Sequence, residues 1–187
     1  MCVALNSPVV IVLASGRGER FAASGGTTSK LQAQLAGKTV LRHTLDAVKA
    51  SGLPWHLEDS GQPGMGDSIA AAVRATWQAN PQLAGWLIMP ADLPLIQSTT
   101  LRSVATALGK HEVVVPVYQR QCGHPVGFSA TCGQALMKLK GDKGAAPVVQ
   151  SHAAHALIVD DAGCVSDIDT VADLRAAERL LRRNLSP

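Results

Sequence analysis

The sequence predicts an α/β fold, a three-layer Rossmann-like domain in which helices cover both faces of a mostly parallel central sheet. Short runs rich in β-branched residues, at 9–13, 86–89 and 112–118, have the length and continuous apolar character of buried strands. Longer segments with apolar residues at helical spacing separate these runs. The chain of 187 residues is long enough for one such core and short for two, so residues 1–187 are expected to form one domain.

Composition and charge exclude several classes of protein. A net charge of +3 with 3% aromatic residues does not suit a nucleic-acid-binding protein, although it suits an anionic small substrate. No apolar run approaches the roughly 18 residues of a membrane helix, and no basic segment precedes the first apolar residues as in a signal peptide, so a cytoplasmic protein is expected. Four cysteines form neither a CxxC pair nor a zinc spacing and are expected to be free thiols: Cys2, Cys122, Cys132 and Cys164.

The first strand, residues 9–13, ends in a loop that combines glycines with basic residues. Glycines turn the backbone tightly and aim N–H groups at one point, and the basic side chains add permanent positive charge. The loop is neither a Walker sequence nor a dinucleotide fingerprint, because Phe21 stands where the third glycine of the fingerprint belongs. We interpret it as a cradle for a polyphosphate; a flexible βα loop is the alternative. The residues expected to hold this ligand are Leu13, Ala14, Ser15, Gly16, Arg17, Gly18, Arg20 and Lys30.

Two helices and a short strand are predicted next. Apolar residues at helical spacing make a helix of residues 39–51, and residues 55–59 predict a strand beside the first one. A second helix begins near Gly64, with Asp67 or Ser68 as its cap. The free N–H groups at its start can receive a base carbonyl or a phosphate. This second group of candidate ligand-binding residues comprises Gly64, Met65, Gly66 and Ser68.

The strand at residues 86–89 delivers Asp92 at its carboxyl end, between Pro90 and Pro94. Ligands of open α/β sheets bind at the carboxyl ends of strands, so this carboxylate lies where a magnesium ligand is needed. We expect it to be exposed and to contribute little to core packing. A structural role is the alternative, either in an Asx turn or as the cap of a helix that begins near Ser98.

A pair of strands and two further helices follow. Residues 112–118 and 123–129 predict strands joined by a polar turn, with His124 at the start of the second. His124 has two possible roles: it contacts a substrate, or it is a loop histidine whose hydrogen bonds go to the backbone. A helix then ends at Gly141, and the next helix begins directly after it. Asp142 is predicted primarily as the N-cap of this second helix.

The last strand and helix flank two aspartates, Asp167 and Asp169. Side chains alternate along an extended segment, so both carboxylates can face one cation. The alternative is a favourable interaction with the start of the following helix, for which Thr170 is the expected N-cap. The buried face of this helix is expected to consist of Leu174, Ala177, Leu180 and Leu181.

Several short motifs follow one another along the chain: LASGRGERF with SKL, GMGDSI, PADLP, GHP, GDKGA and DIDTVADL. In this order they resemble the molybdenum cofactor cytidylyltransferase-type nucleotidyltransferases, which have a MobA-like NTP transferase domain, and they cover nearly the whole chain. The resemblance implies a nucleotidyltransferase fold that lacks one strand–helix unit of the family, because only residues 53–63 separate the first long helix from GMGDSI.

The resemblance also implies a Mg²⁺-dependent transferase that moves CMP from CTP to the phosphate of molybdopterin and releases pyrophosphate. Asp92 and Asp169 would hold the metal, with Asp169 preferred to Asp167. Arg20, Lys30 and Asp92 would carry the catalysis. An ionised phosphate nucleophile needs no general base. The residues implied for binding the acceptor are His124, Asp142 and Lys143.

Donor and acceptor have alternatives within this resemblance. The pair Ala14-Ser15 is closer to the LAAG loop of the cytidylyl enzymes than to the LAGG loop of the guanylyl relatives, which favours CTP over GTP. Glu19 and the insertion at residues 22–29 depart from the family pattern and bear on the donor contact. The alternative functions are a guanylyltransferase, a sugar-phosphate nucleotidyltransferase and a non-catalytic cofactor chaperone that serves a molybdoenzyme. Neither nucleic acid nor a membrane is expected as a partner.

Overall fold

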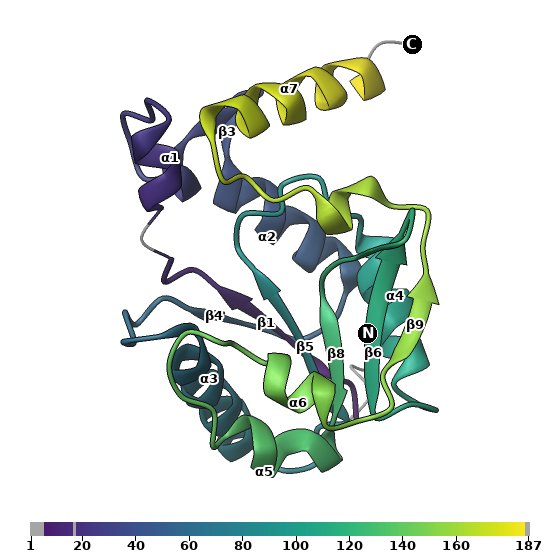
Figure 1. Cartoon of the computed structure of the whole chain (residues 1–187). Coiled ribbons are helices and arrows are strands. Elements are labelled where there is room, and N and C mark those ends of the chain that lie inside the picture. The colour runs from purple at the N-terminus through teal and green to yellow at the C-terminus, as the bar shows by residue number, and fades with distance from the viewer. Residues whose placement is uncertain (1–5, 17, 186–187) are drawn as a thin grey trace.

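The computed structural model describes residues 6–16 and 18–185, and its centre is a seven-stranded sheet (Figure 1). The strands run in the order β4-β1-β5-β8-β6-β7, and β9 pairs with β6 beside this path. β1 is parallel to β4 and β5, and β6 is parallel to β9, whereas β8 is antiparallel to β5 and β6. The predicted α/β class and the mostly parallel sheet are therefore confirmed. The strands are β1 Val9–Leu13, β4 Trp55–Glu58, β5 Gly85–Pro90, β6 Val113–Tyr118, β7 Gln121–Cys122, β8 Val126–Ser129 and β9 His155–Ile158.

Helices cover both faces of this sheet, as Figure 1 shows. One face carries α2 Val40–Ser51 and α4 Ser98–Ala107. The opposite face carries α3 Met65–Ala79, α5 Gly133–Leu136 and α6 Ala146–Gln150. These are the three layers that the alternation of strands and helices predicts.

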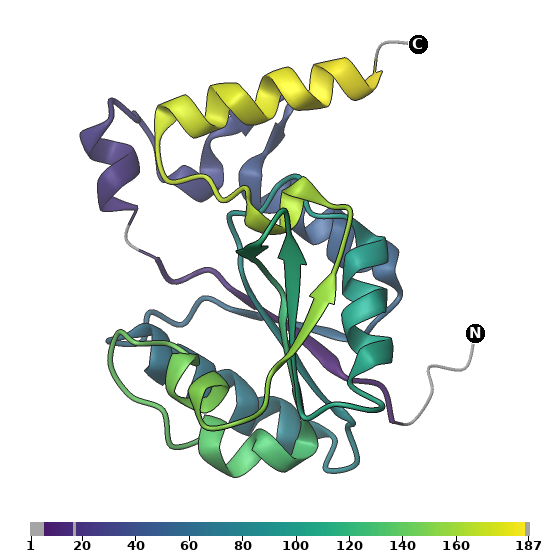
Figure 2. The same ribbon diagram turned by 45° about the vertical axis from the view of Figure 1, so that its right-hand side comes forward.

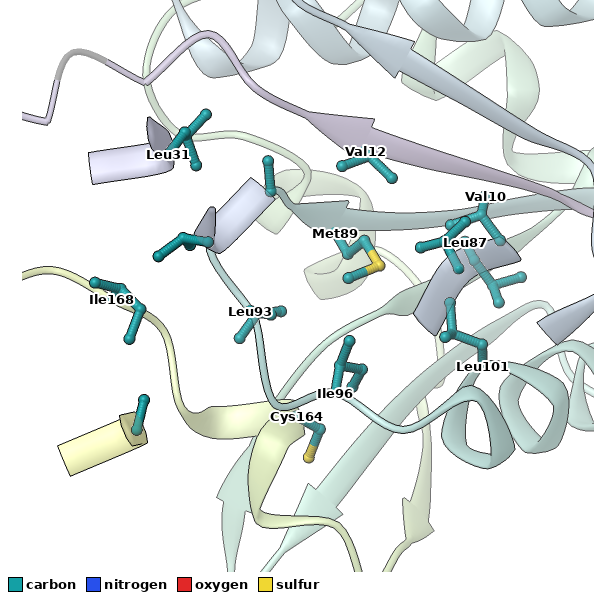
Figure 3. Close-up of a cluster of buried hydrophobic side chains, with 14 of the residues drawn as sticks. Val10, Val12, Leu31, Leu87, Met89, Leu93, Ile96, Leu101, Cys164 and Ile168 are labelled. Carbon is teal, nitrogen blue, oxygen red and sulfur yellow. The ribbon is translucent and has the colours of Figure 1, made fainter. Parts of the chain in front are cut away.

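β1 lies between two hydrophobic cores. Val10 and Val12 belong to the core beneath α2 and α4, whereas Val9 and Ile11 belong to the core beneath α3. In Figure 3, the first pair lies close to Leu87 and Met89 of the neighbouring β5. Because successive side chains of a strand point to opposite faces, a strand buried on both sides is apolar throughout, and this is the pattern that predicts β1 from the sequence.

A small group of elements beyond the carboxyl end of β1 forms what we call the edge lobe. It consists of α1 Glu19–Ala23, the 3₁₀ helix η1 Lys30–Gln32, the hairpin strands β2 Gln34–Leu35 and β3 Lys38–Thr39, and α7 Val171–Leu185. In both views α7 lies beside the hairpin, and it contacts β2 (Figures 1 and 2). The backbone N–H of Val171 donates a hydrogen bond of 2.9 Å to Ser24 Oγ. The N-terminal loop and the C-terminal helix are therefore joined. Two further 3₁₀ helices are η2 Ala130–Cys132 and η3 Ala162–Val165.

The starts of two helices differ from the prediction. α3 begins after Gly64, and Asp67 lies inside its first turn, where its carboxylate accepts a 2.8 Å hydrogen bond from the N–H of Gly141. α6 begins after Ala145, so Asp142 is not its N-cap. Rules for helix caps use the local sequence only, whereas Asp67 here serves a loop that is distant along the chain.

Asp92 does not cap α4, and that alternative is wrong. The N-cap of α4 is Gln97, whose backbone N–H donates to the Asp161 carboxylate at 3.0 Å. The hydroxyl of Thr100 donates to the same carboxylate oxygen at 2.6 Å. Asp161 thus holds the start of α4, and Asp92 is left for another role.

α7 agrees with one prediction and corrects another. The Thr170 hydroxyl accepts from the N–H of Asp173 at 3.2 Å, and the Asp173 carboxylate accepts from the N–H of Thr170 at 2.7 Å. This reciprocal pair is a capping arrangement, so Thr170 is confirmed as the N-cap. Ala177 is buried, but Leu180 is 42% exposed and does not belong to the buried face. The helix packs along a narrower stripe than predicted because it lies at the edge of the molecule.

Two findings bear on the expectations from composition. Cys122, Cys132 and Cys164 are free thiols as predicted, and Cys2 lies outside the described residues. In the part of the chain that the structure describes, no helix has the length and apolar character needed to cross a membrane.

Candidate active site

A cavity of about 410 Å³ opens at the carboxyl ends of β1 and β5. These strands are parallel neighbours, so the segments that follow them meet at one edge of the sheet. β8 is antiparallel to β5, which brings its beginning to the same edge. The polar and charged side chains in the cavity wall are those of Ser15, Arg20, Lys30, Ser68, Asp92, His124, Asp167 and Asp169.

Lys30 lies between two of the predicted carboxylates. Its Nζ is 2.5 Å from Asp92 Oδ2 and 3.1 Å from Asp169 Oδ1. The second oxygen of Asp169 pairs with Arg20 Nη1 at 2.5 Å. Gly18 has a left-handed φ of 64° at the start of α1, and a side chain there would approach the stem of Lys30. The structure therefore brings together the four residues Arg20, Lys30, Asp92 and Asp169, which are distant in the sequence.

The charges of this cluster shift the pKa values of its members. Burial disfavours the ammonium of Lys30, but the hydrogen bonds and charges of Asp92 and Asp169 outweigh it, so the pKa of Lys30 is raised. Burial also opposes ionisation of Asp169, yet its hydrogen bond to Lys30 and the charges of Lys30 and Arg20 hold its pKa below the ordinary value. Desolvation at the cavity wall, aided by the charges of Asp92 and Asp169, raises the pKa of Asp167.

We expect the acid stability of the protein to depend on Asp169. A carboxyl group with a lowered pKa in the folded state stabilises the fold above its unfolded pKa, and this contribution is lost as the pH falls through the folded value. Between about pH 5 and about pH 2, the free energy of unfolding of Asp169→Asn, from urea titrations, should therefore fall less steeply than that of the parent. Equal slopes would contradict a stabilising role for Arg20 and Lys30 at this carboxylate.

Asp92 is buried, in contrast to the expectation of an exposed carboxylate; only 6% of the residue is accessible. The reason is that η1 of the edge lobe brings Lys30 over it. Its Oδ1 is buried and has no hydrogen-bond partner among the described residues. A buried carboxylate oxygen is costly to leave unpaired. This atom therefore indicates that a bound ligand, which is not part of the protein, supplies its partner.

The start of α3 forms the opposite wall of the cavity. Ser68 is buried, and its hydroxyl is 3.0 Å from the hydroxyl of Ser15, so the two candidate ligand-binding segments are in direct contact. A Cβ on Gly64 or Gly66 would collide with the backbone at residues 140–141. The N–H of Gly66 already donates to a carbonyl there, that of Gly141, at 2.7 Å. These two glycines therefore allow close packing of backbones, and the N–H of Gly66 is not free for a ligand.

The remaining predicted residues are distributed over several positions. Gly16 and Leu13 line the main cavity, whereas the backbone N–H of Ala14 donates to the carbonyl of Glu58. A smaller hollow of about 280 Å³ adjoins the cavity at Ser15, Gly16 and Met65, and Gly64 also lines it. Gly18 lines a depression beside Arg20 and Lys30. Arg17 lies outside the described residues.

The three predicted acceptor residues are not together. His124 lines the main cavity with Asp167, and its pKa is lowered by burial against the opposing charges of Asp92 and Asp167. Asp142 lines the smaller hollow, next to Ser15 and Gly64. Lys143 is exposed and lines neither of these two spaces.

Sequence reasoning missed the apolar part of the cavity wall. It is formed mainly by Leu31, Ile69, Ile88, Val126, Phe128 and Ala145. Ile69 directly follows the candidate residue Ser68, and Val126 and Phe128 follow His124 in the alternating pattern of a strand, so the sequence held a signal for these positions. An apolar wall beside charged groups suits a ligand with a flat organic ring and an anionic end.

Comparison with protein families identifies the family of this chain. The family model of the MobA-like NTP transferase domain matches residues 46–157, more than half of the chain. The chain belongs to this family. In this MobA-like domain the matched range includes Asp92 and His124, whereas Lys30 and Asp169 lie outside it. Lys30 joins the site through its contact with Asp92, and Asp169 joins it through its contact with Lys30.

Solved structures match this MobA-like domain over nearly its whole length. Rv0371c from Mycobacterium tuberculosis H37Rv is 26% identical with a TM-score of 0.77, over 93% of this chain and 98% of that chain. A structure of Rv0371c in complex with manganese is 25% identical with a TM-score of 0.72, over 93% and 99%. Both matches extend well beyond the range of the family model.

One further relative matches in part, and one further solved structure shares the fold alone. The purine catabolism protein PucB of Bacillus subtilis (strain 168) is 28% identical over 129 residues, which are 67% of this chain and 62% of PucB. The match thus spans less than two thirds of that relative. The molybdopterin-guanine dinucleotide biosynthesis protein A of Archaeoglobus fulgidus has a TM-score of 0.68 at 16% identity, over 94% of this chain and 99% of that chain, and shares the fold.

Proposed function

We propose that this MobA-like domain is a metal-dependent nucleotidyltransferase that transfers a nucleoside monophosphate, with CTP as the favoured donor, to a phosphorylated acceptor. The observation that carries this proposal is the cluster of Arg20, Lys30, Asp92 and Asp169 at the wall of the cavity. It combines cations for a polyphosphate with carboxylates for a divalent metal. The family supports the same reaction class.

In the proposed reaction an acceptor phosphate oxygen forms a bond to the α-phosphorus of the nucleoside triphosphate. The bond from that phosphorus to the bridging oxygen breaks, and pyrophosphate leaves with the electron pair. Arg20 and Lys30 bind the departing phosphates, and Arg17 is a further candidate for this role. Because the phosphate nucleophile is already ionised, the protein contributes orientation and charge, and no side chain has to remove a proton.

The residues fit a hard divalent cation such as Mg²⁺, which would neutralise charge on the reacting phosphate oxygens. Asp92 Oδ1 is buried without a partner, and the carboxylates of Asp169 and Asp167 line the same cavity. Within the described ranges, no three His, Cys, Asp or Glu side chains are grouped as a metal site. We therefore propose that Asp92 and Asp169 hold the metal together with phosphate oxygens of the donor. The manganese complex of Rv0371c supports a metal in this family.

We expect Ser15 to influence the choice between CTP and GTP. In Ser15→Gly the hydroxyl contact with Ser68 is lost and space opens for a larger base, so the ratio of kcat/KM for CTP over GTP should fall about fivefold, the scale of one neutral hydrogen bond. Competition kinetics with both triphosphates measure this ratio. Ser15→Ala is the matched control, because it removes the hydroxyl but keeps the Cβ carbon. An unchanged ratio in Ser15→Gly would mean that Ser15 does not face the base, and a parent preference for GTP would contradict the cytidylyl proposal.

For the acceptor we propose molybdopterin, bound on the side of the cavity where His124 and Asp167 lie. The experiment incubates the purified protein with each nucleoside triphosphate, Mg²⁺, and either molybdopterin or a set of sugar 1-phosphates, and measures pyrophosphate release. Release with CTP and molybdopterin is the expected result. Release with a sugar 1-phosphate alone would keep the reaction class and change the acceptor, and no release with any pair would contradict the proposed enzyme.

A further inference from the structure

We propose that Lys30 is the internal counter-ion of the metal-free site, and that it has to leave Asp92 and Asp169 before a divalent metal binds there. Metal and triphosphate then enter together. This inference rests on the proposed function and adds that the binding of its two ligands is coupled through one side chain.

The first step of the argument is the position of the ammonium group. Lys30 Nζ contacts one oxygen of each carboxylate, at 2.5 Å from Asp92 and 3.1 Å from Asp169. Its side chain is only 15% exposed, and that of Asp92 only 8%. Contact with two carboxylates at the wall of one cavity is what a bound metal ion would make here, so Lys30 takes the electrostatic place of the metal.

The second step is that the two cations exclude each other. A divalent ion on these carboxylates would lie within a few ångströms of the ammonium, in a site that is screened from water, where like charges repel strongly. While Lys30 stays in place, it occupies Oδ2 of Asp92. Only the buried Oδ1 of this carboxylate is then unpaired. Metal alone therefore has to compete with a covalently attached cation.

The third step is that a triphosphate gives Lys30 another partner. A depression of about 260 Å³, lined by Gly16, Gly18, Arg20, Lys30 and Asp169, adjoins the ion cluster. Lysine has a flexible stem with four rotatable bonds and is a compact charge, so its ammonium can turn from the carboxylates to phosphate oxygens in this depression. The carboxylates are then free for the metal, and each ligand favours the binding of the other, as linkage requires.

The test is the affinity for Mn²⁺, measured by the electron paramagnetic resonance of free Mn²⁺ with and without a non-hydrolysable CTP analogue. In the parent protein, the analogue should raise the affinity of the protein site about tenfold or more, after correction for Mn²⁺ held by free analogue. In Lys30→Met, Mn²⁺ alone should bind about tenfold more tightly than to the parent, and the effect of the analogue should shrink. Lys38→Met is the matched control, since Lys38 also pairs with an aspartate, Asp46, but on the surface; its Mn²⁺ affinity should equal that of the parent.

Equal or weaker binding of Mn²⁺ by folded Lys30→Met would overturn the inference. If this variant does not fold, the measurement on the parent protein is sufficient. The same Mn²⁺ affinity of the parent with and without the analogue would also overturn the inference. Neither outcome depends on turnover. A protein that fails this test but releases pyrophosphate keeps the proposed function, and one that passes but transfers no nucleotide loses the proposed function and keeps the coupling.

Discussion

Replacing Asp92 by asparagine should abolish nucleotidyl transfer, with a loss in kcat on the order of 10³-fold or more. The amide keeps the size of the side chain but removes the charge that pairs with Lys30 and, in our proposal, with the metal. Because Asp92 is buried, we also expect a loss of stability of about 1.5–3 kcal/mol, the scale of a hydrogen bond to a charged group. An exposed carboxylate would have shown the first effect without the second.

Steady-state pyrophosphate release and urea unfolding measure the two effects of Asp92→Asn. Asp46→Asn is the matched control, since Asp46 also pairs with a lysine, Lys38, but lies outside the cavity, and it should leave turnover unchanged. Undiminished turnover in Asp92→Asn would contradict the metal role. The same substitution at Asp167 and at Asp169 tests which of the two carboxylates holds the metal. An inactive Asp167→Asn together with an active Asp169→Asn would reverse our preference for Asp169.

Replacing Arg20 by alanine should lower the rate with triphosphate by about 10²–10³-fold, which is typical for the loss of one preorganised charged donor. Arg20 reaches into the cavity wall from α1 and pairs there with Asp169 at 2.5 Å, although its side chain is 80% exposed. Because the side chain is so exposed, water screens its ion pair with Asp169, and the pair contributes little to stability; the unfolding transition near neutral pH should therefore hardly change. The loss then belongs to substrate binding and reaction alone.

Arg20→Lys should recover only part of this rate, because a guanidinium can grip two phosphate oxygens and an ammonium is a point charge. Arg42→Ala provides the control: Arg42 is also an exposed arginine paired with an aspartate, Asp46, at 2.9 Å, and it lies on α2 away from the cavity. Initial rates over a range of triphosphate concentrations distinguish the variants. A loss below about tenfold in Arg20→Ala would make this residue an ordinary surface arginine.

The sequence predicted those parts of the site that depend on local patterns. Strand length and apolar character predict β1 and the placement of Asp92 after β5. Asp167 and Asp169 are two residues apart, and the alternation of side chains along an extended segment predicts that both face the same side. Each of these signals lies within a few neighbouring residues. The order of motifs along the chain then predicted the family, which the match over residues 46–157 confirms.

What the sequence could not predict depends on residues that meet only in the folded chain. Asp92 is buried because Lys30 lies over it, and no local pattern contains that contact. Gly64 and Gly66 look like a ligand-binding helix start, yet their missing side chains make room for the backbone at residues 140–141. Small residues signal a close approach of backbones, but not which segment approaches.

The ribosome makes Arg20 and Lys30 well over a hundred residues before Asp169. The strands β1, β5, β6 and β8 all precede Asp169, so the middle of the sheet can pair while its final carboxylate is still unmade. Only afterwards can α7 join the N-terminal loop through the bond from Val171 to Ser24. A chain that has not yet reached Asp169 therefore lacks the carboxylate that pairs with both Arg20 and Lys30, and the proposed site is complete only after this residue has been made.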